Sequence, residues 1–443
     1  MGFNTFIKNN SVLNTILFTI SKEKAERLLS VRDEWEKIQN ERLADILNYA
    51  KVHSCYYQAL LAPTKITPQE AVKVLKSLPL LTKSIIREQY FDIFSDTISP
   101  SWKIWGNTGG STGEPLKFPR LCNRMWNEMI HQYYTYKYLG GNEACVWNDI
   151  IVSIAGDRIP EEKLKDKVFY LKSRNFPMGK YSFSTLYMFE ENLDYYVSSL
   201  NVIKPSYIRA YSAGALTLAQ HIKKKNIGLT FKLKGIYLTS EAFSEQSRRF
   251  ISEVFHCPVI GQYGHTEMSV YAIQHKDDSI YECMPLYGYT EILDERGNHV
   301  EEGQTGEIVV TGFNQIGLPF IRYKTGDIAT YKGTSKGIVY IDAIQGRTVD
   351  YLYDKEGNSV FLTGAIFGGH IKAFNHIAQW QLRQIKKGKV QVSIIKGEGY
   401  NCEIENEIIR FFSGFNIEAS LYYVDYIEKQ KNGKQKFLIQ EIQ

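Results

Sequence analysis

KGIYLTSEAFSEQSRRFISEVFHCPVIGQYG, residues 234–264, predicts a buried strand, an amphipathic helix and a second buried strand in succession. The same alternation precedes it, because DIIVSIA (149–155) and SYIRAYS (206–212) resemble strands and SAGALTLAQHIKKK (212–225) resembles a helix. Strands that alternate with helices of this length pair in parallel through right-handed crossovers. The centre of the chain is therefore predicted to be an α/β fold whose ligands lie beyond the carboxyl ends of the strands.

The pattern changes near residue 281, where short apolar segments separated by Gly and Asp turns predict antiparallel sheet or a small barrel. These segments are YGYTEILDERGNHV (287–300), GEIVVTG (306–312), IRYKTGDIATY (321–331) and IVYIDAIQGR (338–347). Further along, strands are predicted for KVQVSIIK (389–396), ASLYYVDYI (419–427) and KFLIQEI (436–442), and a helix for NEIIRFF (406–412). We expect a large N-terminal domain, residues 1–347, with parallel-rich sheets, helices and a small β-barrel-like part. A small α+β domain, residues 348–443, should follow it.

The N-terminal region is predicted to be helical. Apolar residues at multiples of three or four positions indicate one buried stripe along a helix that covers much of residues 21–50. They are Leu28, Val31, Trp35, Ile38 and Ile46. The preceding SVLNTILFTI (11–20) is too short to span a bilayer, so we expect a packed helix there, with loose peripheral membrane contact as the alternative.

Composition excludes several classes of protein. The 443 residues are 44% hydrophobic and contain no low-complexity run, which indicates a folded globular protein rather than a disordered one. A net charge of +5 without a long basic tract fits small anionic ligands and does not favour nucleic acid. The six cysteines form no C-x-x-C pair, which suits a reducing compartment and a cytoplasmic location, and we expect no structural metal.

The glycine-rich stretch GNTGGSTGEP, residues 106–115, indicates a loop for phosphate. Its consecutive glycines let backbone N–H groups converge on an anion, and Thr108, Ser111 and Thr112 add hydroxyl donors. The pattern G-x-x-x-x-G-K-[ST] of a P-loop is not met, because Glu114 follows Gly113. On composition alone, a flexible surface turn is an equally good interpretation.

Two later segments carry groups that suit a nucleotide. QYGHTE (262–267) follows a predicted strand, so Tyr263 could stack on a base, Thr266 could bind a phosphate and Glu267 could hold Mg²⁺. In YKTGD (323–327), Asp327 follows a tight turn, where its carboxylate could accept both hydroxyls of a ribose. Arg347 in QGR adds a bidentate cation. Taken singly, each of these is more often an ordinary turn, surface or strand-end residue.

The order of these segments resembles that of the adenylate-forming superfamily of acyl-CoA synthetases, luciferases and peptide-synthetase adenylation domains. STGEP, TSEA, YGHTE, GEIVVTG with PFIRYKTGD, GR and a terminal GK follow one another as they do in that superfamily. The stretches PLLTKSIIRE (79–88) and TSEAFSEQSRRFISEVF (239–255) are similar to the phenylacetate-CoA ligase branch, including its relatives encoded with capsular-polysaccharide genes. The resemblance runs from about residue 40 to the C-terminus.

The resemblance implies roles for individual residues. The loop with Thr108, Gly110, Ser111, Thr112 and Gly113 would contact the β- and γ-phosphates of ATP, although Gly109 replaces the commoner serine and removes one hydroxyl. The adenine pocket would be lined by Ser240, Glu241, Ala242, Tyr263 and Gly264. Thr266 would touch the α-phosphate and Glu267 would bind Mg²⁺. Asp327 and Arg347 would hold the ribose.

The implied reaction has two half-reactions. A carboxylate attacks the α-phosphorus of ATP to give an acyl-adenylate and pyrophosphate, and an acceptor such as CoA, a carrier-protein arm, or an amine or hydroxyl on a saccharide then displaces AMP. The mobile C-terminal domain would deliver Lys434 of KNGKQKF, although Asn-Gly before it is also a common hairpin turn with a solvated lysine after it. The hinge falls at Val349, where aspartate or lysine is commoner, or at the adjacent Asp350.

The acid is predicted to be aryl or a short acyl acid, with amino acids and sugar-linked acids left open. Its pocket would be lined by Tyr133, Tyr134, Phe183, Tyr211 and Ala213 if these residues converge. Two other interpretations stand beside the ligase: a nucleotidyl transferase that leaves AMP on its substrate, and a nucleotide-binding module whose catalysis has decayed.

Overall fold

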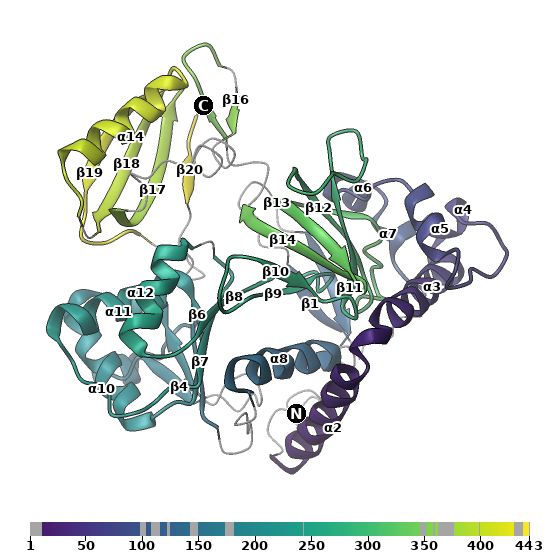
Figure 1. Cartoon of the computed structure of the whole chain (residues 1–443), viewed down its shortest axis with the longest axis horizontal. Helices are drawn as coiled ribbons and strands as arrows, with labels where there is room; N and C mark the ends of the chain where they lie inside the picture. The colour runs from purple at the N-terminus through teal and green to yellow at the C-terminus, as the bar shows by residue number, and fades with distance from the viewer. Residues whose placement is uncertain are drawn as a thin grey trace. The chain divides into compact units, whose positions relative to one another are not determined.

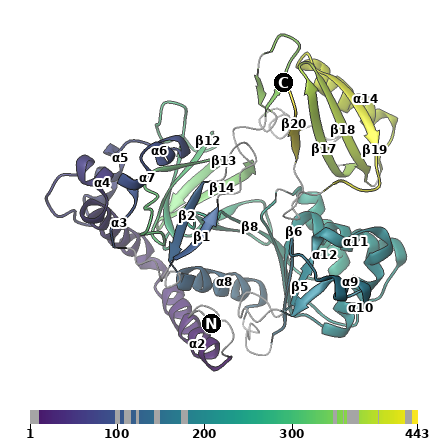
Figure 2. The same ribbon diagram turned by 180° about the vertical axis from the view of Figure 1, so that it is seen from behind.

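The computed structural model of the chain describes residues 11–97, 103–107, 116–121, 125–141, 149–172, 181–241, 243–345, 351–357, 359–361, 376–397, 399–428 and 437–442. These residues form two compact units (Figures 1 and 2). Unit 1 comprises Met1–Ala144, Arg174–Met178 and Ile260–Ile344, and unit 2 comprises Cys145–Ser173, Gly179–Val259 and Gln345–Gln443. The predicted domain division at residue 347 stays a prediction.

Unit 1 begins with a series of helices, most of them short. They are α2 (Ser11–Ser30), the 3₁₀ turn η1 (Arg32–Glu34), α3 (Trp35–His53), α4 (Cys55–Leu60), α5 (Ala71–Ser77), α6 (Lys83–Glu88), α7 (Tyr90–Ile93) and, further along, α8 (Met125–Gly140). None of the helices in these described ranges is long and apolar enough to cross a membrane. The apolar start of the chain does belong to a helix, since α2 runs alongside α8.

The single helix predicted over much of residues 21–50 is wrong in one respect, because η1 separates α2 from α3. Helix α3, which begins at Trp35 directly after this break, contributes to two hydrophobic clusters. Trp35 packs with α8 and the 268–287 region, whereas Leu43 and Leu47 of α3 are buried in a second cluster. The indole N–H of Trp35 donates to the Leu28 carbonyl over 2.8 Å, which satisfies an end carbonyl of α2.

The strands of unit 1 form a mainly antiparallel sheet, as the turn-rich pattern after residue 281 predicts. In spatial order they are β11 (Gly288–Leu293), β12 (Thr305–Gly312), β13 (Tyr323–Ser335), β14 (Ile338–Gln345), β10 (Tyr281–Cys283), β9 (Tyr271–Gln274) and β8 (Val259–Gly264). Antiparallel pairing is seen for β11 with β12, β12 with β13, β10 with β14 and with β9, and β8 with β9. β1 (Lys103–Asn107) and β2 (Lys117–Leu121) form a separate antiparallel hairpin.

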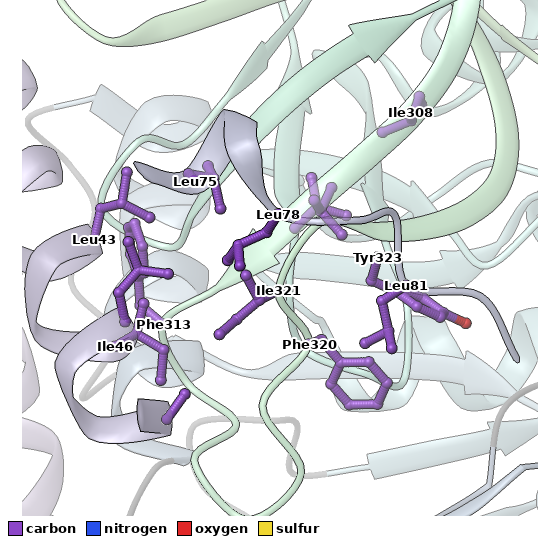
Figure 3. Close-up of a cluster of buried hydrophobic side chains, with 14 of the residues drawn as sticks. Leu43, Ile46, Leu75, Leu78, Leu81, Ile308, Phe313, Phe320, Ile321 and Tyr323 are labelled. Carbon is purple, nitrogen blue, oxygen red and sulfur yellow. The ribbon is translucent and has the colours of Figure 1, made fainter. Parts of the chain in front are cut away.

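One hydrophobic core joins the N-terminal helices to this sheet (Figure 3). Side chains of α3 and α5, such as Leu43 and Leu75, pack with Ile308 and with the 318–323 segment. Leu81 extends the contact, because its N–H donates to the Arg322 carbonyl and its carbonyl accepts from the Lys324 N–H, both over 2.9 Å. The PLLTKSIIRE segment therefore fixes the start of β13, and Thr82 caps α6 by accepting from the Ile85 N–H.

Unit 2 contains the predicted parallel sheet, in the order β7 (Gly235–Thr239), β6 (Tyr207–Tyr211), β3 (Ile151–Ala155), β5 (Tyr181–Ser184) and β4 (Tyr170–Lys172). β7, β6, β3 and β5 pair in parallel, and β4 is antiparallel to β5. The helical elements are α9 (Glu161–Lys165), η5 (Thr185–Tyr187), η6 (Glu190–Asn192), α10 (Leu193–Ile203), α11 (Ser212–Lys225) and α12 (Glu245–Phe255). Helices α10, α11 and α12 lie against this sheet (Figure 2). Their apolar side chains belong to one buried cluster with those of the strands. The α/β prediction is confirmed.

The C-terminal part of the chain is a small α+β structure. Strands β19 (Glu418–Tyr423), β18 (Lys389–Lys396), β17 (Ile377–Lys386) and β20 (Leu438–Gln440) form one sheet, and β15 (Tyr351–Tyr353) pairs with β16 (Ser359–Phe361). Helix α14 (Cys402–Gly414) covers this sheet with Ile404, Ile408 and Phe412 (Figure 1). The predicted strands 389–396, 419–427 and 436–442 and the helix at 406–412 are all present, whereas the sequence interpretation missed β17.

Candidate active site

Two motifs of unit 1 meet through a tyrosine and a carboxylate. Tyr263 stands near the end of β8, and its hydroxyl donates to Asp327 Oδ2 over 2.7 Å. Burial and the adjacent carboxylate raise the pKa of Tyr263 well above its ordinary value, so the phenol keeps its proton and remains a donor. Asp327 follows Gly326, whose φ of +81° suits glycine, and the Thr325 hydroxyl accepts from the Asp327 N–H.

Glu267 is connected to the same segment by a second hydrogen bond. Its side chain is buried, and the Tyr323 hydroxyl donates to Oε1 over 2.9 Å. His265 Nδ1 lies 3.3 Å from the other carboxylate oxygen, Oε2. Burial by itself would raise the pKa of this carboxyl, but the charge of His265 and hydrogen bonds, including that of Tyr323, lower the pKa of Glu267 to about 2. The carboxylate is therefore ionised at neutral pH.

Tyr323 also connects this site to the base of the glycine-rich loop. The residues that flank the glycine-rich stretch in the sequence, Asn107 at the end of β1 and Lys117 at the start of β2, face each other in the hairpin. Phe118 contacts Phe320 edge to face, with ring centroids 5.4 Å apart. The ring centroids of Phe320 and Tyr323 are 5.0 Å apart. The base of the loop, YGHTE and YKTGD are thus brought together within unit 1.

A buried ion pair holds the PFIRYKTGD segment in place. The Arg322 guanidinium binds both carboxylate oxygens of Glu291 at 3.1 and 3.2 Å and donates to the carbonyls of Lys76 and Leu78. All the charged atoms have partners, which is the condition for a buried pair to be tolerated. Sequence interpretation gave no role to Arg322 or Glu291.

The TSEA motif lies in unit 2, where it begins the connection from β7 to α12. Glu241 Oε2 accepts from the Ala213 N–H over 2.9 Å and from the Ser212 hydroxyl over 3.2 Å, so this carboxylate stands at the N-terminus of α11. An anion is favoured there because the first N–H groups of a helix are unpaired. Ser240 adopts a φ of +70°, an unusual conformation for a residue with a side chain.

The residues predicted to line the acid pocket fall in both units. In unit 1, Tyr133 and Tyr134 are buried on α8, where the Tyr133 hydroxyl donates to Glu26 and the Tyr134 ring stacks on Tyr138. In unit 2, Phe183 is completely buried and stacks on Tyr170, which are the contacts of a core residue. Tyr211 and Ala213 lie at the junction of β6 and α11. Convergence of these five residues stays a prediction.

Several predicted site residues lie outside the described part of the chain. They are Thr108, Gly110, Ser111, Thr112, Gly113, Ala242, Arg347 and Lys434, together with the hinge candidates Val349 and Asp350. Thr266 is described and half-buried, and its hydroxyl has no hydrogen-bond partner among the described residues. Gly264 is tightly packed, since a Cβ there would lie 2.8 Å from the Gln262 amide nitrogen and 3.2 Å from the Val270 carbonyl.

Sequence reasoning missed two side chains that touch Glu267. Tyr323 occurs within a quoted motif, and its position four residues before Asp327 on the same strand could have indicated a shared site. His265 stands between the two residues that were assigned, Tyr263 and Thr266. Its neighbours in the sequence were the only available signal.

Comparison with known proteins shows similarity to AMP-binding enzymes. Residues 184–316 match the family of AMP-binding enzymes. The chain is 26% identical over 434 residues to Protein CapK of Staphylococcus aureus, covering 95% of this chain and 92% of that protein. It is 29% identical over 176 residues to phenylacetate-coenzyme A ligase of Pseudomonas putida, covering 38% of this chain and 39% of the ligase.

A solved structure shows the same fold. It is that of 2-hydroxyisobutyryl-CoA ligase in the postadenylation state, in complex with R3-HIB-AMP, and it superposes with a TM-score of 0.65 at 16% identity over 91% of this chain and 89% of the ligase. The chain thus contains a match to AMP-binding enzymes and is similar, over nearly its whole length or over part of it, to relatives that include phenylacetate-coenzyme A ligase. These similarities resemble those of the phenylacetate-CoA ligase-like branch and support an adenylate-forming enzyme of the acid–thiol ligase type.

Proposed function

We propose that the protein activates a small carboxylic acid, aryl or short acyl, with ATP and then transfers the acyl group to a nucleophile. CoA is the leading acceptor, and a carrier-protein thiol or an amine or hydroxyl of a saccharide is the alternative. The resemblance to relatives encoded with capsular-polysaccharide genes supports a role in the synthesis of a surface polysaccharide. We expect the reaction to take place in the cytoplasm.

The observation that carries this proposal is the pair of hydrogen bonds between YGHTE and YKTGD. Tyr263 donates to Asp327 and Tyr323 donates to Glu267, so each motif contributes one tyrosine and one carboxylate. Two carboxylates that are held by separate neutral donors can serve two different parts of one nucleotide. Asp327 would accept from the ribose hydroxyls, and Glu267 would face the phosphates.

The chemistry needs positioning more than covalent help. In the first step a carboxylate oxygen forms a bond to the α-phosphorus while the bond from that phosphorus to the pyrophosphate oxygen breaks. In the second step the acceptor attacks the acyl carbonyl and AMP leaves with the electron pair of the broken C–O bond. Because the reactants already contain a nucleophile and an activated phosphate, alignment and neutralisation of charge supply the acceleration.

Glu267 fits the magnesium ion that would accompany ATP. Its carboxylate is ionised, Oε1 is fixed by Tyr323, and oxygen ligands are those that Mg²⁺ prefers. When bound, Mg²⁺ would neutralise charge on the phosphates. Thr266 would donate its unpaired hydroxyl to the α-phosphate, and Gly264 would leave room for the base beside Tyr263.

The other assignments complete the proposal. Thr108, Gly110, Ser111, Thr112 and Gly113 would bind the β- and γ-phosphates. Ser240, Glu241 and Ala242 would border the adenine. Glu241 would be held there by its hydrogen bonds to the start of α11. Arg347 would bind the ribose, and residues 348–443 would act as a lid that carries Lys434 and turns at Val349 or Asp350.

Acid-dependent exchange of labelled pyrophosphate into ATP tests the proposal. A panel of aryl, short acyl, hydroxy and amino acids should contain at least one that supports exchange, and Asp327→Asn should reduce that exchange by raising the KM for ATP. Tyr331→Phe, at an exposed hydroxyl of the same strand, serves as the matched control. The proposal would be contradicted if none of the acids on the panel supported exchange. It would also be contradicted if AMP remained covalently attached to the acid or the acceptor at the end of the reaction.

A further inference from the structure

His265 has the surroundings of a ligand-binding side chain rather than those of a structural histidine. Both ring nitrogens are shielded from solvent, and neither makes a hydrogen bond to any residue that the structure describes. The ring contacts Tyr323 edge to face with centroids 6.3 Å apart, which holds it beside Glu267. Nδ1 has only the ion-pair contact with Glu267, and Nε2 has no partner among the described residues, so the ring suits a partner from a bound ligand, because buried polar atoms nearly always have partners.

The contact with Glu267 does not satisfy the imidazole. Nδ1 lies 3.3 Å from Oε2 without hydrogen-bond geometry. Charge-assisted N–H···O bonds are shorter, about 2.7 to 2.9 Å. Glu267 is also fixed from its other side, because Oε1 accepts from the Tyr323 hydroxyl over 2.9 Å. Oε2 and Nδ1 are thus left facing each other.

The 3.3 Å distance between His265 Nδ1 and Glu267 Oε2 suits two atoms that bind the same metal ion. Oxygen or nitrogen ligands at about 2.1 Å from a small divalent ion, at right angles to each other, lie about 3 Å apart. Among the residues that the structure describes, no group of three or more His, Cys, Asp or Glu could hold a metal alone. Nucleotide phosphates and water would therefore complete the shell, as they do for metals that enter with ATP.

We propose that His265 is a second protein ligand, giving an imidazole nitrogen beside the Glu267 carboxylate oxygen to the divalent cation that enters with the nucleotide. This inference rests on the proposed function, which gives Glu267 the metal. Imidazole nitrogen suits first-row transition ions better than Mg²⁺, which prefers oxygen. The enzyme should accordingly use Mn²⁺ or Co²⁺ at lower concentrations than Mg²⁺.

Pulsed electron paramagnetic resonance of Mn²⁺ tests this ligation without relying on catalysis. The full chain is mixed with Mn²⁺ and a non-hydrolysable ATP analogue, once unlabelled and once with ¹⁵N-histidine. A ¹⁴N coupling that becomes a ¹⁵N coupling on labelling identifies a protein histidine and excludes the adenine ring. The wild-type spectrum alone decides whether a histidine binds the ion, so the test does not depend on the folding of a variant.

His265→Asn then identifies which histidine it is. The variant should lose the histidine coupling and bind Mn²⁺ at least roughly tenfold more weakly in the nucleotide complex. His299→Asn is the matched control, because its ring lies against Tyr331 in a different part of unit 1. Retention of the coupling in His265→Asn would overturn the inference.

The outcomes separate this inference from the proposed function. A wild-type complex that binds Mn²⁺ and nucleotide without a histidine coupling, together with normal pyrophosphate exchange, overturns the role of His265 and leaves the ligase proposal intact. Failure to bind Mn²⁺ with the nucleotide, together with no exchange for any acid, overturns both.

Discussion

The Tyr323 hydroxyl donates to Glu267 Oε1 over 2.9 Å, and both side chains are buried. The bond joins a residue on β13 to one in the turn after β8, so a donor 56 positions away in the sequence orients the carboxylate proposed to bind the cation. The bond therefore couples the orientation of the Glu267 carboxylate to that of the Tyr323 ring.

Tyr323→Phe removes this donor and keeps the ring. We expect the free energy of unfolding to fall by about 2 kcal/mol, because a buried carboxylate oxygen loses a hydrogen bond. The Mg²⁺ concentration for half-maximal pyrophosphate exchange should rise several-fold, since the carboxylate is less well oriented. Urea unfolding and a Mg²⁺ titration measure the two effects. A stability loss with unchanged Mg²⁺ dependence would restrict Tyr323 to a structural role.

Glu267→Gln tests the cation site directly. The amide keeps an acceptor for Tyr323 and loses the negative charge, so use of Mg²⁺ with ATP should weaken at least tenfold in the exchange assay. The KM for the acid should change little by comparison. An unaltered Mg²⁺ requirement would refute the assignment of Glu267.

The lowered pKa of Glu267 predicts a pH effect on stability. Its folded value of about 2 lies below the ordinary 4.5, so its contribution to stability is fully present above about pH 4.5 and is lost as the pH falls toward 2. The difference in unfolding free energy between wild type and Glu267→Gln should therefore shrink between pH 5 and pH 3. Denaturant titrations at these two values measure it, and a constant difference would show that the carboxyl has an ordinary pKa.

Lys434→Ala tests the proposed lid. Because the lysine would act on the phosphates in the first half-reaction, the variant should lose pyrophosphate exchange and keep most of the transfer from a pre-made acyl-adenylate to CoA. Lys431→Ala, three residues earlier in the same segment, is the matched control. Equal loss of both half-reactions would assign Lys434 a structural task.

The sequence predicted the regular elements well because their periodicity is local. The strands at 149–155, 206–212 and 235–239 and the helices between them depend on apolar patterns within each segment. The break between α2 and α3 was missed because the apolar stripe continues through it, and no local pattern marks the short 3₁₀ turn at Arg32–Glu34.

The candidate site was predicted only in part, because motif order is visible in the sequence and contacts between distant segments are not. Motif order pointed to Tyr263, Glu267 and Asp327, and two hydrogen bonds now connect their segments. His265 and Tyr323 were not assigned, because the weight of both depends on their contacts with Glu267, and the position of Tyr323 in the YKTGD motif was a signal that was not used. The resemblance assigned Glu241 to the adenine pocket, whereas its bond to the Ala213 N–H at the start of α11 could be seen only in the fold.

The series of rings from Phe118 through Phe320 to Tyr323 limits how this protein can change over evolutionary time. A ring of different size at any of the three would shift both the stem of the glycine-rich loop and the phenol that holds Glu267. Substitutions in the hairpin and in β13 should therefore be accepted together or not at all, even though more than two hundred residues separate them in the chain.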